Sequence, residues 1–303
     1  MLVAGFVALL LLVAPVAIAA ELDDYLAEAA DASYAGERAV WSSFAGETEF
    51  SVVSVEQAGS TVMVESGGSS QVVGDGKVAG VGSSGNGVAL ADWSSVPPAD
   101  RYETTSVRSD VRLGRDAVVI TVEEAGETRA RFWFDEETGA ALGSEVYDGQ
   151  GELFRLSWML DFDANPRRIY TVLGASAYDL VVTADAGDLP ATVAGYTRVD
   201  TYRGPNDSIH AFYSDGLFSF SVFLIDGEGV TGPFVDADEM SVGSGTYRWI
   251  LTASELWVQW SGSGKTYVLV GDLPPDHLET VLQELPAPDG GNFLSRIWKG
   301  IFG

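Results

Sequence analysis

The sequence contains no cysteine, which excludes disulfide bonds, thiolate metal sites and cysteine nucleophiles. Histidine is almost as scarce, since the chain has only His210 and His277. These two residues lie far apart in the sequence, and no H-E-x-x-H motif is present. A zinc site would need carboxylates to supply its other ligands, because cysteine is lacking. We therefore predict neither a bound metal nor a cofactor.

Basic residues are also few. The chain has 17 lysines and arginines against 44 aspartates and glutamates, which gives a formal net charge of -27. This balance disfavours binding to nucleic acids, whose phosphates require clustered basic side chains, and unaided docking on an anionic lipid surface. Two interpretations remain: an acidic coat that keeps the protein soluble, including in a salty environment, or a surface for a basic partner. The spread of charge along the whole chain favours the coat.

Motifs of catalysis are lacking as well. The run GSGKT at residues 262–266 looks like the end of a phosphate-binding loop, but Gln259 stands where that motif requires a glycine. The run also lies between two strand-like segments, so we predict a hairpin turn. No G-x-S-x-G nucleophile elbow is present. Carboxylates are so abundant that counting them says little about a glycosidase-like pair. We predict that the protein is not an enzyme, with an extracellular hydrolase as an alternative.

Residues 1–20 form an uncharged, apolar run that ends at the acidic Glu21. The small residues at positions 17 and 19 fit the cleavage pattern of a secretory signal peptide, although the start of the run contains no lysine or arginine. A stretch of this length is also just long enough to span a bilayer. We expect either a signal peptide or a membrane anchor, and in both cases the remaining chain lies outside the cytoplasm.

The remaining sequence is typical of a globular protein with a sizeable core, because 46% of all residues are hydrophobic and 11% are aromatic. A first helix is predicted where Leu22, Leu26 and Ala29 recur at helical spacing. From residue 50 to about residue 162 the pattern indicates short β-strands. Within this stretch, residues 67–95 are rich in glycine and serine, and we expect weak strands and mobile loops there.

Two predicted hairpins, with turns at residues 135–139 and 148–151, contain the most informative aromatic residues. Their strands are apolar on both faces, which indicates either packing on both sides or one face that lines a cavity. An ordinary β core explains most of these positions. The alternative is a cavity for an acyl chain, because lipid pockets have mostly aromatic and aliphatic walls. The candidates for that cavity are Phe132, Phe134, Phe154, Leu156 and Trp158.

The sequence predicts two units in succession. Residues 21–165 form a large β unit, and residues 166–195 form a connecting segment, because N-P-R-R breaks the β pattern there. A smaller α+β unit follows over residues 196–286. It contains several strand-like runs and closes with a helix that starts at Pro274 and Pro275.

Residues 287–303 form a tail that is the only basic amphipathic element in this acidic chain. A helix here would gather its large apolar side chains on one face, with Arg296 and Lys299 elsewhere. Three roles stay open for the tail. It docks back onto the fold, lies in a membrane interface, or enters the groove of a partner.

Three stretches together suggest a known family. Residues 131–154, RFWFDEETGAALGSEVYDGQGELF, combine an aromatic strand, a D-E-x-T-G turn and a second turn. Residues 210–229, HAFYSDGLFSFSVFLIDGEG, contain a Y-S-D-G-L segment that leads into a strand with S-V-F. Residues 266–285, TYVLVGDLPPDHLETVLQEL, form a strand, a proline-containing turn and a helix. The chain thereby resembles the RseB/MucB family of envelope-stress regulators over nearly its whole length after residue 20, and Y-S-D-G-L is the most specific piece.

The resemblance implies an α+β fold of mostly antiparallel strands. In it, an incomplete β-barrel wraps over a helix, as in the lipoprotein carriers LolA and LolB, and a smaller α+β domain follows. It also implies a periplasmic or cell-envelope regulator that binds the extracytoplasmic part of a membrane anti-sigma factor and shields it from proteolysis. Lipid-like envelope ligands would release the regulator, through a lipid-sensing cavity bordered by the candidates above. The alternative is a lipid or lipoprotein carrier of the LolA/LolB type without a signalling partner. The partner-binding candidates that the resemblance implies are Tyr213, Ser214, Asp215, Gly216 and Leu217.

Overall fold

The computed structural model describes residues 19–59, 61–66, 69–74, 77–81, 100–166, 181–182, 185–203, 207–229 and 232–289. Most of the predicted leader, a large part of the Gly/Ser-rich region and of the connecting segment, and the tail beyond residue 289 lie outside the described residues. Among the helices that are described, none is long and apolar enough to cross a membrane.

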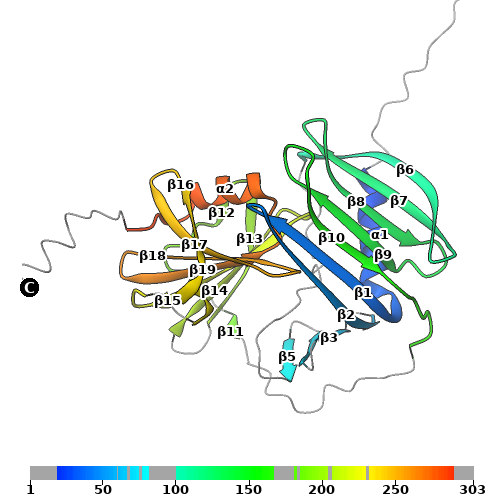
Figure 1. Ribbon diagram of the computed structural model, residues 1–303, viewed down its shortest axis with the longest axis horizontal. Coiled ribbons are helices and arrows are strands. Elements are labelled where there is room, and N and C mark those ends of the chain that lie inside the picture. The colour runs from blue at the N-terminus through cyan, green and yellow to red at the C-terminus, as the bar shows by residue number, and fades with distance from the viewer. Residues whose placement is uncertain are drawn as a thin grey trace, which may run out of the picture.

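The described chain forms two antiparallel sheets, which lie beside each other in Figure 1. The first sheet has ten strands in the order β5-β4-β3-β2-β1-β10-β9-β8-β7-β6. Strand β10 pairs with β1, so the two ends of this part of the sequence meet in the middle of the sheet. Its strands are β1 (Ser33–Phe44), β2 (Glu47–Ala58), β3 (Thr61–Ser66), β4 (Ser69–Gly74), β5 (Lys77–Val81), β6 (Tyr102–Arg112), β7 (Arg115–Glu124), β8 (Glu127–Asp135), β9 (Ala141–Tyr147) and β10 (Leu153–Met159).

The second sheet follows the order β11-β13-β14-β15-β19-β18-β17-β16, and β12 pairs with β13 beside this path. Helix α2 (Pro275–Glu284) packs against this sheet and buries the side chains of Leu278, Val281 and Leu282. Its strands are β11 (Val181–Val182), β12 (Thr192–Val193), β13 (Tyr196–Arg203), β14 (Ile209–Ser214), β15 (Ser219–Asp226), β16 (Asp238–Val242), β17 (Gly245–Leu251), β18 (Leu256–Gly262) and β19 (Lys265–Gly271), with the short helix η2 (Gly232–Asp236) between β15 and β16.

The predicted α+β class, with mostly antiparallel strands, is confirmed. One boundary differs from the prediction, because the second sheet begins before residue 196. Strands β11 and β12 lie in the predicted connecting segment and pair with β13. Each has only two residues, which is too short for an alternating pattern to reveal it.

The predicted hairpin turns are present, and each contains a residue whose backbone is in the left-handed conformation. Gly139 and Gly151 have positive φ values of 70° and 81° in the turns that flank β9. The GSGKT run joins β18 to β19, with positive φ at Ser263 and Gly264, as expected for a tight hairpin and not for a phosphate loop.

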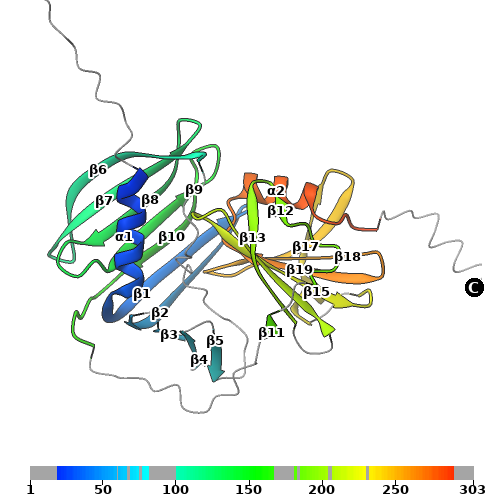
Figure 2. The same ribbon diagram turned by 180° about the vertical axis from the view of Figure 1, so that it is seen from behind.

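The predicted first helix is α1 (Ala19–Asp31), and it lies across one face of the first sheet (Figure 2). Leu22 and Leu26 are buried in the same hydrophobic cluster as Phe132 and Phe134 of β8. The ring of Tyr25 stacks on that of Phe134 with the centroids 5.3 Å apart. Helix α1 therefore packs on the aromatic face of β8.

The opposite face of this sheet has its own aromatic pair. Gly143 of β9 lies in register between Trp133 of β8 and Trp158 of β10, and the two indole rings are 4.5 Å apart. The guanidinium of Arg112 lies 3.7 Å from the centre of the Trp158 ring. A Cβ atom at Gly143 would stand 2.5 Å from Cε3 of Trp158. The rings can therefore meet only because residue 143 has no side chain.

We expect Gly143→Ala to lower the free energy of unfolding by about 1–3 kcal/mol, because the new methyl group must displace the Trp158 ring, which contacts both Trp133 and Arg112. Urea unfolding measures this change. The matched control is Gly229→Ala, where nothing lies within 4 Å of the place that the new methyl group would take. The control should change stability by less than about 0.5 kcal/mol. Equal effects of the two substitutions would contradict the packing described here.

Candidate functional site

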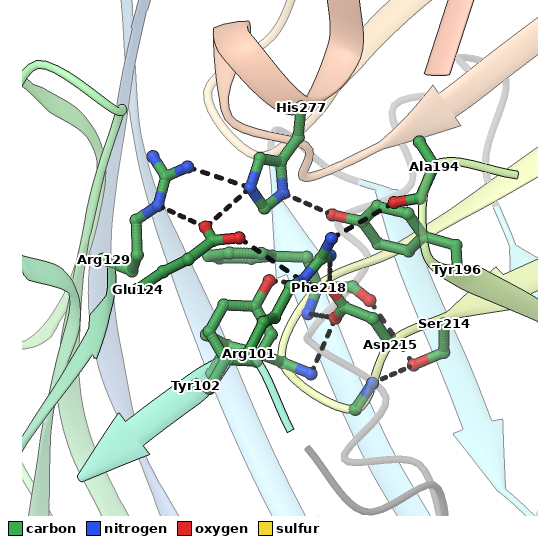
Figure 3. A network of polar contacts seen from close by, with 12 residues as sticks. Arg101, Tyr102, Glu124, Arg129, Ala194, Tyr196, Ser214, Asp215, Phe218 and His277 are labelled. Atoms are coloured by element: carbon green, nitrogen blue, oxygen red, sulfur yellow. Dashed lines mark hydrogen bonds and ion pairs between the residues drawn. The ribbon is translucent and has the colours of Figure 1, made fainter. Parts of the chain in front are cut away.

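The two sheets meet in a polar junction, where the ends of β6, β7 and β8 approach helix α2 and strand β13 (Figure 3). Hydrogen bonds and ion pairs cross from one sheet to the other, and aromatic rings pack around them. We define the junction as Arg101, Tyr102, Glu124, Arg129, Tyr196, Asp215, Asp276 and His277.

The β7–β8 hairpin supplies the first half of the junction. Its two-residue turn, Ala125-Gly126, has positive φ at both positions, which is typical of a turn that matches the twist of antiparallel strands. Glu124 pairs in register with Glu127, and Arg129 lies where the register shifts between Thr128 and Ala130. From there, Nε of Arg129 donates to Oε2 of Glu124 at 2.7 Å. The side chain of Arg129 is only 6% exposed, so its charge depends on protein partners.

Helix α2 supplies the second partner of Arg129. Asp276 lies in the first turn of the helix, and Nη1 of Arg129 donates to its Oδ1 at 3.2 Å, while Nη2 pairs with Oδ2. The backbone N–H of Gly149 also donates to Oδ1, at 3.1 Å. Burial alone would raise the pKa of Asp276, but hydrogen bonding and the charge of Arg129 outweigh it, and the pKa lies below its usual value. Asp276 is therefore anionic and ties the start of α2 to the first sheet.

His277 is the centre of the network. Its Nδ1 lies 2.7 Å from Oη of Tyr196. Its Nε2 lies 2.9 Å from Oε2 of Glu124 and 2.9 Å from Nη2 of Arg129. Burial lowers the pKa of His277, and the charges of Arg101 and Arg129 add to this effect against the opposing charge of Glu124. The imidazole is therefore neutral at pH 7.

Asp215 anchors the other side of the junction from the turn between β14 and β15. One carboxylate oxygen accepts the backbone N–H groups of Leu217 and Phe218 at 3.0 and 2.8 Å. The other carboxylate oxygen accepts a hydrogen bond from Oη of Tyr102 at 2.6 Å and pairs with the guanidinium of Arg101. The same carboxylate thus shapes its own turn and holds the first strand of the β6–β7 hairpin.

A second, smaller contact joins the sheets at the end of strand β1. Oγ of Ser42 donates to the backbone carbonyl of Thr252, and the ring of Phe44 packs edge-on against Trp249 with the centroids 4.9 Å apart. Together with the junction, this contact fixes the two sheets at two separate places.

The Y-S-D-G-L segment is largely buried, and its Asp215 belongs to the junction. Tyr213, Ser214 and Asp215 are 0%, 2% and 3% exposed, and Gly216 and Leu217 are half-buried. As candidates for direct contact with a partner, the first three are covered in this arrangement. Of these three, Asp215 has partners in the first part of the chain, Arg101 and Tyr102. The hydroxyl of Tyr213 donates to the carbonyl of Pro190, and that of Ser214 to the carbonyl of Phe218.

The five cavity candidates do not share one face of the first sheet. Phe132, Phe134 and Phe154 belong to the hydrophobic cluster that includes α1. Trp158 packs on the other face with Trp133, and Leu156, two residues away on the same strand, is also half-buried there. A register shift between Leu153 and Arg155 separates Phe154 from these two, which sequence alternation alone could not reveal. A lipid cavity beside Phe132, Phe134 and Phe154 stays a prediction.

Sequence reasoning missed most of the junction. The sequence singles out only two of its members: His277 as a possible metal ligand, and Asp215 as a partner-binding candidate that the resemblance implies. Among the described residues, no group of three or more histidines, aspartates and glutamates could hold a metal ion. Arg129 and Asp276 are separated by 147 residues, so no local pattern joins them. The one available signal was the scarcity of basic residues, since a buried arginine in an acidic chain is expected to have acidic partners.

Comparisons with known proteins address the arrangement as a whole. No protein-family model matches the chain, and no protein of curated function matches it. Among solved structures, the crystal structure of MucB matches with a TM-score of 0.55 and 20% identity, over 89% of this chain and 98% of that chain. The chain has an RseB/MucB-like fold. The expectation from the resemblance is thereby confirmed for the fold.

Two further structures with this fold are complexes. A chain of the Pseudomonas aeruginosa MucA/MucB complex matches with a TM-score of 0.50 and 20% identity, over 89% of this chain and 99% of that chain. The structure of MucB in complex with MucA(peri) matches with a TM-score of 0.50 and 19% identity, over the same shares. In each comparison the RseB/MucB-like match spans both sheets, and therefore includes the region of the junction.

The Tyr102–Asp215 hydrogen bond should contribute to the stability of this RseB/MucB-like fold. We expect Tyr102→Phe to lower the free energy of unfolding by about 1–2 kcal/mol, because a buried carboxylate loses a donor. The matched control is Tyr147→Phe, whose hydroxyl bonds to Glu145 within the first sheet and is partly exposed. Urea unfolding of both variants checks this expectation, and a control that is as destabilised as Tyr102→Phe would contradict it.

Arg129 and Asp276 should be energetically coupled across the two sheets. A double-mutant cycle with Arg129→Met and Asp276→Asn is expected to give a coupling energy of about 1–3 kcal/mol, because either single change leaves a charge without its partner. Arg129→Met alone should cost about 3 kcal/mol. Strictly additive effects in the cycle would show that the pair does not hold the sheets together.

Proposed function

We propose that this protein is a non-enzymatic regulator outside the cytoplasm that binds the extracytoplasmic part of a membrane anti-sigma factor. One observation supports this most: the similarity to MucB, including MucB in complex with MucA(peri), extends over 89% of the chain. A shared single domain would leave the function open, because folds are reused for many functions. Similarity that extends across both sheets supports a role that uses both of them.

The chemistry of the described residues is consistent with a binding role. The arginines and carboxylates of the junction are all paired: two arginines face three carboxylates, and each of the three carboxylates pairs with one or both of the arginines. Such matched pairs hold an arrangement in place. The leader at residues 1–20, which lies almost entirely outside the described residues, would deliver the protein to the periplasmic or cell-envelope side.

The second part of the proposal is a lipid-like ligand that controls partner binding in envelope-stress signalling. The first sheet would act as an incomplete β-barrel around α1, and its aromatic face would take the acyl chain. The helix on that face supports this, because a lipid can enter where a helix lies on apolar side chains. Lipid binding would then shift the population toward a state that does not bind the partner.

The same aromatic face also suits a lipid or lipoprotein carrier of the LolA/LolB type without a signalling partner. In that case the junction would only fix the second sheet to a carrier domain. The amphipathic tail, which falls outside the described residues beyond 289, would provide membrane contact in either role.

A pull-down from detergent-solubilised native membranes tests the proposal. The chain from residue 21 onward is the bait, and mass spectrometry identifies what it retains. We expect a single-span membrane protein that is an anti-sigma factor. Recovery of lipids or lipoproteins alone would replace the regulator with the carrier.

A pair of arginine variants sharpens this test. Arg129→Met weakens the junction and should recover at least about tenfold less partner, if binding needs both sheets in their present arrangement. Arg203→Met removes an arginine of the second sheet whose ion pairs with Asp185 and Asp207 are exposed, and it should recover as much partner as the natural chain. Circular dichroism confirms that both variants are folded before the comparison is made.

A further inference from the structure

The junction contains a ring nitrogen that faces two incompatible neighbours. Nε2 of His277 is 2.9 Å from a carboxylate oxygen of Glu124, which accepts hydrogen bonds, and 2.9 Å from Nη2 of Arg129, which donates them (Figure 3). If Nε2 carries a proton, it satisfies Glu124 and opposes Arg129. If it carries none, it accepts from Arg129 and opposes Glu124. The position of one proton therefore decides which contact of His277 is favourable.

The same nitrogen lies between the two sheets. Glu124 and Arg129 belong to β7 and β8 of the first sheet, whereas His277 belongs to α2 and its other partner, Tyr196, to β13. A second proton on the imidazole would bring a positive charge to within hydrogen-bond distance of a guanidinium that is itself 6% exposed. In such a dry setting this repulsion is poorly screened.

The other charged and titratable groups around His277 come from every element that packs on it. Arg101 precedes β6, and Tyr102 begins it; Asp276 stands beside His277 on α2, and Asp215 lies in the β14–β15 turn. Arg101 adds a second positive charge, with its Nε 3.6 Å from Oε1 of Glu124. The start of a helix is also an unfavourable place for a cation.

We propose that the junction is a proton-controlled joint, in which neutral His277 holds the two sheets together and protonated His277 separates α2 from the β7–β8 hairpin. The relative position of the two sheets would then depend on the pH outside the cytoplasm. This inference does not require the proposed anti-sigma-factor partner, because it concerns the chain alone.

The sign of the effect follows from the titration of the neighbouring groups. The pKa of His277 is lowered in the fold, so the closed junction is fully favoured above the ordinary histidine pKa of about 6.5 and is progressively lost as the pH falls toward the lowered value. Hydrogen bonding and charge pairing with Arg129 lower the pKa of Glu124 and of Asp276, against the opposing effect of burial. Both carboxylates therefore stay charged between pH 5 and pH 7.5, so among Glu124, Asp276 and His277 only the histidine changes charge in this window.

The sequence offers an internal control, because its other histidine is outside the junction. His210 lies on β14, where its ring stacks on Phe223 with the centroids 4.4 Å apart. Burial lowers its pKa to about 4. His277→Gln leaves only His210, and His210→Gln leaves only His277, so each variant isolates one titration.

The absence of cysteine allows a direct measurement of the separation between the sheets. Glu136→Cys and Ser241→Cys place one dye on an exposed position of each sheet, and energy transfer between the dyes is followed from pH 7.5 to pH 5. We expect a reversible shift in transfer efficiency in the labelled natural chain and in His210→Gln, with a midpoint below pH 6.5. The shift should be lost in His277→Gln. Far-ultraviolet circular dichroism must stay constant over the window, which separates opening from unfolding.

Two results would overturn the joint: no shift in the natural chain, or an undiminished shift in His277→Gln. Where His277→Gln does not fold, His210→Gln decides instead. Its single imidazole gives the pKa of His277 by nuclear magnetic resonance, and that pKa must coincide with the midpoint of the dye signal. A mismatch between the two values also rejects the proposal.

Discussion

The burial of one positive charge, that of Arg129, constrains the arrangement of the two sheets. A guanidinium that is 6% exposed requires carboxylates close by, and Glu124 comes from the first sheet while Asp276 comes from α2. Removing such a cation from water is costly, and only close, well-aligned partners offset the cost. The sheets therefore cannot slide or rotate freely, since either movement would leave the charge without one partner. In this RseB/MucB-like chain, the paired charge of Arg129 therefore sets the position of the two sheets relative to each other.

Apolar contacts make the association of the two sheets favourable, and the polar groups determine their relative position. A single hydrophobic cluster runs from Leu22 on α1 to Leu285 beside α2, through both sheets. Burial of apolar surface is non-directional and would tolerate several relative positions. The paired charges and the Ser42–Thr252 contact select one of them. The two kinds of interaction thus have different roles: the cluster makes association favourable, and the polar groups make it specific.

Local features were predictable from the sequence, and the junction was not. The first helix followed from the spacing of Leu22 and Leu26, and the hairpin turns from their glycines, because both depend on neighbours in sequence. The side of the sheet on which Phe154 and Trp158 lie depends on a register shift that alternation does not show. The family resemblance made Asp215 a candidate for partner binding, yet its contacts with Arg101 and Tyr102, which lie more than 110 residues away in sequence, could not be predicted. A contact of that separation becomes visible only once the chain is folded.

Strand β8 connects the two features on which the proposed function depends. Phe132 and Phe134 of this strand form the face under α1, and Arg129 at its start forms the junction. Neighbouring residues in a strand move together, because the ladder of hydrogen bonds fixes them to β7 and β9. We infer that a ligand which displaces α1 would act on β8 and so on the contacts of Arg129 with α2. Only a ligand that binds the two arrangements with different affinity can do this, and the acyl chain of the proposed function would meet that condition if its insertion beneath α1 required the helix to move.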